Sequence, residues 1–223
     1  MEQNNYYETN NFLNAKKGIS RIYTGLLISI LAALCAGIGT TIITIRGREM
    51  QDVNDLLSGN AGPLTLLGIG AVLALIAFLL KFLGIKKASL DEDRFTKALK
   101  FLVIGLVVSF VGGFFTGRSE IVYEIAEILN GVCDMLVTLF IISGTKSLAE
   151  KVGNEHVRSL ASNTYKMILL IYLLVIALGV IALFIENSKM AIIAGILTIG
   201  ILILTIIAFI VFLKMLSQAR KMF

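Results

Sequence analysis

The sequence predicts an all-α integral membrane protein with six transmembrane helices. Hydrophobic residues make up 57% of the 223 residues, the mean hydropathy is +0.88, and the apolar residues gather in six long runs. A helix needs about 20 consecutive apolar residues to cross a hydrocarbon core about 30 Å thick. The runs fall at residues 24–45, 63–83, 99–117, 122–143, 166–185 and 190–213. Because the other segments are short, we expect a polar cytoplasmic tail at residues 1–20 and a single six-helix transmembrane domain at residues 21–223.

The basic residues predict which way round the protein sits in its membrane. Of the 20 lysines and arginines, all but four lie in the terminal tails, in the second and fourth loops or at the span ends next to these loops; the exceptions are Arg46, Arg48, Arg118 and Lys189. Lys and Arg in short loops favour the cytoplasmic side, so both termini are expected in the cytoplasm. We expect the membrane to be a bacterial plasma membrane.

The net charge of +5 follows from this topology. The basic inner face predicts contact with anionic lipid, to which each juxtamembrane Lys or Arg contributes about 1 kcal/mol. Nucleic acid is not an expected partner, because its binding calls for a basic stripe with stacking aromatic residues on a soluble surface. The expected partners are the lipid bilayer and either another membrane protein or a second copy of the chain.

Local signals predict where several helices begin. Residues 46–62 carry apolar side chains at helical spacing, which predicts a short helix on the membrane surface, and Pro63 then opens the second span. The sequence Ser89-Leu90-Asp91-Glu92 matches a capping box, so we expect the third helix to start there, in the cytoplasm. Ser119 is expected to cap the fourth helix.

The six spans form three successive helical hairpins. Arg21 and Arg94 open the first and third spans, and counting on from each brings Gly39 and Gly112 into the same register. Repeats of two spans would all point the same way, since each returns the chain to its starting side. Three parallel hairpin repeats are therefore one hypothesis, and shared membrane chemistry without true repetition is the other.

Small residues at helical spacing predict where helices pack closely. Gly113 and Gly117 form a GxxxG step in the third span, and Gly37 and Gly195 belong to similar small-residue pairs in the first and sixth spans. Such spacing lets two backbones approach in lipid, where helix association gains little from hydrophobicity. We expect these glycines to pack inside the monomer; a dedicated dimer face is the alternative.

Asp134 is the one formal charge deep inside an apolar run. It lies ten residues before Gly144, which is about 15 Å along a helix and places it near the middle of the bilayer. A carboxylate there costs about 2.5–3.5 kcal/mol on insertion scales, so we expect it to face the interior of the bundle. Such a residue is by default a candidate for function.

A polar stripe accompanies this aspartate. Glu127 lies seven residues before Asp134, and Asn130 is close to the same helix face. Ser109 in the third span lies at a similar depth, and Tyr172 in the fifth lies about one turn nearer the cytoplasm. One interpretation is a site for a proton or small cation, entered from outside. The other is structural: the outer acids are solvated first turns of a helix, and Asp134 is neutral and ties helices together.

Enzymatic function is not expected. An intramembrane enzyme needs a partnered nucleophile, a carboxylate pair or a metal set, and the single histidine, His156, falls in a cytoplasmic loop. The sequence holds no metal-binding H-E-x-x-H and no nucleotide-binding glycine motif, so neither a metal nor a cofactor is predicted. We therefore predict a non-enzymatic accessory, assembly or immunity-type membrane component. The alternative is a small proton- or cation-linked transporter or channel that uses Asp134.

Overall fold

The computed structural model describes residues 12–47, 61–116, 118–182 and 188–223. They form α-helices without a strand: α2 (Leu13–Gly47), α4 (Ala61–Ala88), α5 (Asp93–Phe115), α6 (Glu120–Val152), α7 (Glu155–Ala182) and α8 (Ser188–Ala219). By length and composition, all six can cross a membrane. The predicted all-α protein with six membrane helices is confirmed. The surface helix predicted at residues 46–62 falls largely on residues 48–60, outside the described part.

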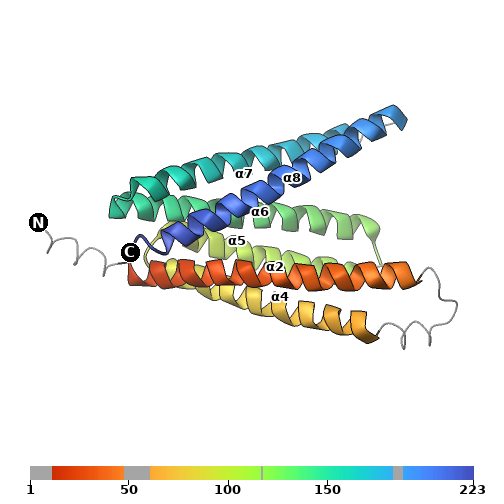
Figure 1. Cartoon of the computed structure of the whole chain (residues 1–223), viewed down its shortest axis with the longest axis horizontal. Coiled ribbons are helices and arrows are strands. Elements are labelled where there is room, and N and C mark those ends of the chain that lie inside the picture. The colour runs from red at the N-terminus through yellow and green to blue at the C-terminus, as the bar shows by residue number, and fades with distance from the viewer. Residues whose placement is uncertain (1–11, 48–60, 117, 183–187) are drawn as a thin grey trace, which may run out of the picture. The chain divides into compact units, whose positions relative to one another are not determined.

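The helices belong to two compact units. Residues 20–84 form what we call the hairpin unit, and residues 12–19 together with 85–223 form the main unit. In the main unit, α5 packs on α6, α6 on α7 and α7 on α8 (Figure 1). The side of the main unit where α5 starts and α6 finishes is called the basic end, and the opposite side is called the acidic end.

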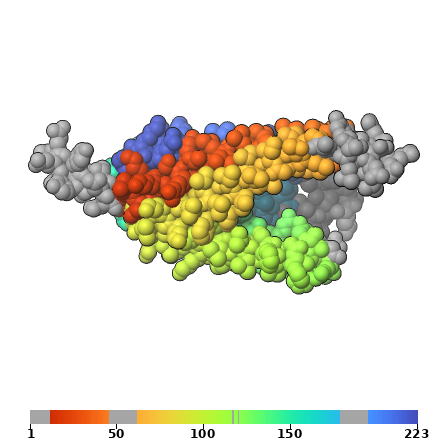
Figure 2. Space-filling view, turned by 90° about the horizontal axis from the view of Figure 1, so that it is seen from below, coloured from red at the N-terminus to blue at the C-terminus, as the bar shows by residue number. Residues whose placement is uncertain are grey.

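Glycines bring the two helices of the hairpin unit together. Helices α2 and α4 lie against each other along their length (Figure 2). A Cβ added at Gly25 would lie 2.9 Å from the carbonyl oxygen of Ala77, and one added at Gly39 would lie 3.0 Å from that of Pro63. The absence of a side chain at these positions permits backbone contact, as is common between membrane helices.

At the basic end, the helices extend beyond the apolar runs. Helix α2 begins at Leu13, within the segment expected as a polar tail, and Ala15 and Ile19 are buried. Helix α5 begins at residue 93 and α7 at residue 155, where the apolar runs begin only at 99 and 166. Hydropathy marks the part of a helix that suits hydrocarbon, whereas the helix itself ends where its backbone finds a cap.

The core of the main unit lies toward its basic end. The fully buried large side chains there include Phe95, Ile141, Ile142, Leu148, Val157, Met215 and Leu216. Toward the acidic end, large apolar side chains of α6 such as Ile125 and Ile128 are exposed, the latter at 68%. Exposed aliphatic surface on a helix of this length suits contact with lipid.

The turn between α4 and α5 differs from the predicted capping box. Helix α4 continues to Ala88, and the hydroxyl of Ser89 donates to the carbonyl of Lys86 at 2.8 Å. Glu92 is the N-cap residue of α5, but its side chain makes no capping hydrogen bond. The capping-box prediction is wrong because both acids of this turn bond to other helices. Asp91 accepts hydrogen bonds from the backbone N–H of Ala15 at 2.7 Å and from Asn14 at 3.1 Å, and so caps the start of α2.

The other helix ends follow local rules. Ser119 is the N-cap residue of α6, as predicted, although its side chain makes no capping hydrogen bond. Gly153 ends α6 with a φ of 72°, a left-handed conformation that favours glycine. Asn154 then caps α7, because its side-chain oxygen accepts a hydrogen bond from the N–H of Val157 at 3.0 Å.

Candidate functional site

Two glycines of α5 bring that helix close to α6. A Cβ added at Gly112 would lie 2.7 Å from the Cβ of Ala126, and one added at Gly105 would lie 3.1 Å from the Cβ of Cys133. The same position at Gly105 is 3.3 Å from the side-chain oxygen of Asn130. These contacts pair the two helices closely enough for polar side chains between them to share one space.

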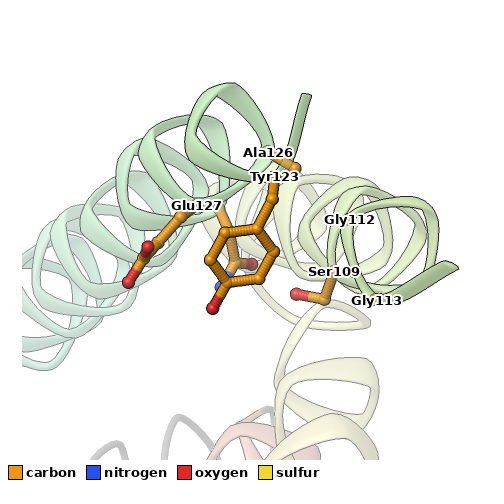
Figure 3. Close-up of a pocket in the computed structure, with 7 residues that line it drawn as sticks. Ser109, Gly112, Gly113, Tyr123, Ala126 and Glu127 are labelled. Carbon is orange, nitrogen blue, oxygen red and sulfur yellow. The ribbon is translucent and has the colours of Figure 1, made fainter. Parts of the chain in front are cut away.

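A cavity of about 290 Å³ lies between α5 and α6 near the acidic end. Four polar side chains line it, together with Gly112, Gly113 and Ala126: they are Ser109, Tyr123, Glu127 and Asn130. Figure 3 shows Ser109 on α5 facing Tyr123 on α6, with Glu127 on the far side of the tyrosine ring. The structure thus brings together three of the polar residues singled out in the sequence, Ser109, Glu127 and Asn130. Tyr123 was missed, although it precedes Glu127 by four residues and so shares its helix face.

Asp134 does not line this cavity. Its side chain is exposed, whereas the neighbouring Cys133 is buried against α5. Within the described ranges, no hydrogen bond or salt bridge reaches its carboxylate; the hydroxyl of Thr138 donates to its backbone carbonyl at 2.9 Å. Tyr172 on α7 is half-buried and lies within electrostatic range of the Asp134 carboxylate.

Burial along one face of α6 ends at Asp134. Ile141 and Thr145 lie seven and eleven residues further on, so they share its face, and they are 1% and 0% exposed. Asp134 and Glu127, toward the acidic end of the same face, are exposed. The sequence placed Asp134 toward the bundle interior. In the structure, Asp134 lies on the helix face that is buried toward the basic end. At the position of Asp134 itself, the main unit no longer covers this face.

The close helix contacts do not fall on the glycines that the sequence singled out. A Cβ added at Gly37, Gly113 or Gly195 would meet nothing within 4 Å, and Gly117 lies outside the described residues. The contact in α5 is made by Gly112 instead. Successive residues of a helix differ by about 100° in direction, so a shift of one residue moves a glycine off the contact face.

Two single substitutions in α5 test this assignment. Gly112→Ala should lower the free energy of unfolding by about 1–2 kcal/mol, because the new methyl group collides with Ala126. Gly113→Ala should be neutral or stabilise the helix by up to about 1 kcal/mol, since its Cβ meets open space. Equilibrium unfolding in mixed micelles measures both. Equal effects of the two substitutions would contradict the assigned contact face.

A second polar cluster lies at the basic end. The Glu92 carboxylate is buried and accepts hydrogen bonds from Lys151 at 2.6 Å and from Ser147 at 3.0 Å. Arg94 lies 3.8 Å from the same carboxylate and donates to the carbonyl and hydroxyl of Ser143. The sequence alone does not reveal this cluster, because its members are about 50 to 60 residues apart in the chain. Each of its charges has a partner, which favours a structural role.

Neither polar cluster groups the side chains that a metal ion needs. In the described part of the chain, no group of three His, Cys, Asp or Glu side chains is placed to hold a metal ion. The polar groups between α5 and α6 can exchange hydrogen bonds and attract a cation. A function of this site would depend on these two kinds of contact. No protein-family model, curated protein or solved structure matches this chain.

Proposed function

We propose that this protein is a non-enzymatic accessory, assembly or immunity-type component of a bacterial plasma membrane. The observation that carries the proposal is the exposed polar face of α6, which holds Glu127 and Asp134 in a helix able to span a membrane. A charged group facing lipid is costly, whereas polar groups between membrane helices form favourable contacts. A surface of this kind favours a role in binding another membrane protein.

The basic end supports a fixed orientation in this role. Lys86, Lys97, Lys100, Lys214 and Lys221 are exposed there. Exposed basic residues favour the cytoplasmic side and contact with anionic lipid, which agrees with cytoplasmic termini. The buried core at the same end would then give the protein a rigid base, with the polar face of α6 nearer the outer side of the membrane.

A small proton- or cation-linked transporter or channel is the second candidate function. The observation that favours it is the row of polar groups from the α5–α6 cavity inward: Glu127 and Asn130 line the cavity, and Asp134 lies about one helical turn beyond. It ranks second because the cavity does not include Asp134, so these groups do not line one continuous space.

Ion flux in liposomes separates the two functions. Protein reconstituted in liposomes that hold a pH gradient or a K⁺ gradient should leave both gradients as stable as in protein-free liposomes, and Asp134→Asn should change nothing. Glu124→Gln, which removes one exposed carboxylate nearer the start of α6, is the matched control. Gradients that collapse with the wild-type protein and the control, but persist with Asp134→Asn, would replace the accessory function by transport.

A further inference from the structure

The carboxylate of Asp134 is framed by side chains that suit hydrocarbon. It lies fourteen residues after Glu120, which is about 21 Å along α6. Ile128, Leu129 and Val132, in the preceding turns, are all exposed apolar residues. A side chain at this level of a membrane helix therefore lies at the depth of the hydrocarbon core, where an unneutralised carboxylate is unfavourable.

None of the six apolar runs carries a Lys or Arg near its middle. Only Lys81, Lys100 and Lys166 fall within the six apolar runs, and each stands at the basic end of its run. Lys100 lies on the side of α5 opposite the buried Ala98 and Leu102. A second copy of the chain carries the same residues, so it would not place a Lys or Arg at this depth either.

We infer that the exposed face of α6 around Asp134 binds a membrane-spanning helix of another protein that carries a Lys or Arg near the middle of the bilayer. The inference rests on the proposed accessory function and names the chemistry of its partner. Charge complementarity identifies this occupant, because ionisable groups inside membranes pair with one another. Asn130 and Glu127 on the same face and Tyr172 on α7 supply further oxygens that can accept hydrogen bonds from an ammonium or guanidinium group.

Synthetic helices of defined sequence test this inference. A fluorescent polyleucine peptide of about 20 residues carries Lys at its centre; matched peptides carry Met or Gln there, or carry the Lys near one end. Each is mixed in lipid vesicles with the full-length protein labelled at its amino terminus, and association is measured by energy transfer. Asp134→Asn removes the charge, and Glu124→Gln is the control for loss of an exposed carboxylate elsewhere on α6.

The central-Lys peptide should associate with the wild-type protein about tenfold more strongly than the Met peptide. Asp134→Asn should abolish this preference and Glu124→Gln should preserve it. Moving the Lys to the peptide end should also remove the preference, a comparison made on the wild-type protein and independent of how any variant folds.

Three results would overturn the inference: equal binding of the Lys and Met peptides, equal binding of the Lys and Gln peptides, or a preference that survives in Asp134→Asn. Equal binding of Lys and Gln would mean a neutral polar contact in place of an ion pair. The gradient measurement in liposomes decides the proposed function separately. Stable gradients with no Lys preference would reject the cation-bearing helix alone, while an Asp134-dependent collapse would reject the accessory function itself.

Discussion

Lys151→Met should lower the free energy of unfolding by about 2–3 kcal/mol, because it leaves the buried Glu92 carboxylate without its closest cation. Removing one partner of a buried ion pair typically costs 3–5 kcal/mol. The smaller value is expected here because the Lys151 side chain is 45% exposed, and because Arg94 and Ser147 remain near the carboxylate. Equilibrium unfolding in mixed micelles measures the change.

A double substitution distinguishes the ion pair from other effects of Lys151. In Glu92→Leu combined with Lys151→Met, no charge is left buried, so most of the lost stability should return. Glu150→Gln is the control, because Glu150 pairs with Arg158 at an exposed site where both side chains are at least 40% exposed. Such a surface pair contributes less than about 1 kcal/mol. If Lys151→Met had no more effect than Glu150→Gln, the buried pair would not stabilise the fold.

Gly144→Ala is expected to lower the free energy of unfolding by about 2–3 kcal/mol, the upper part of the range for overpacking a core. The added Cβ would lie 2.6, 2.9 and 3.1 Å from three ring atoms of Phe95. This ring is fully buried between helices and has little room to move. The same unfolding measurement on the full-length protein reports the loss.

The matched control lies on the same helix. Gly131→Ala adds the same methyl group where nothing lies within 4 Å, so it should be neutral or slightly stabilising. Replacing the Phe95 ring by a smaller side chain relieves the collision. Adding Gly144→Ala to a Phe95→Leu background should therefore lower the free energy of unfolding much less than it does in the wild type. Equal stability of the Gly144→Ala and Gly131→Ala variants would show that the Phe95 contact does not limit the packing of α5 on α6.

The turn between α4 and α5 shows that a local sequence signal does not predict which helix a side chain bonds to. Ser89 and Glu92 have the spacing of a capping box, yet Glu92 bonds to Ser147 and Lys151 of α6, and Asp91 bonds to the start of α2. A carboxylate near a helix start can satisfy its own helix or a neighbouring one with similar hydrogen bonds. Which of them it satisfies depends on which helix end the fold brings within reach.

The candidate site was predicted in part. Ser109, Glu127 and Asn130 were chosen by depth and helix face, and all three line the cavity between α5 and α6. Depth and face follow from the rise and turn of a helix, which are the same in every sequence. Tyr123 was not recognised, since an aromatic residue near the end of a span is commonly an interfacial anchor. The hairpin repeats, the orientation in the membrane and the function stay predictions.

Six helices able to cross a membrane follow from the amino-acid sequence alone, because long apolar runs have few other stable arrangements. The packing of the helices shows in addition that the core of the main unit lies toward the basic end, that Gly112 rather than Gly113 contacts α6, and that the α6 face carrying Asp134 is buried only toward the basic end. Hydrophobicity separates lipid from water but does not distinguish lipid from a neighbouring helix. Which apolar face packs, and which polar group stays uncovered, therefore follows from shape and hydrogen bonding between residues distant in the chain.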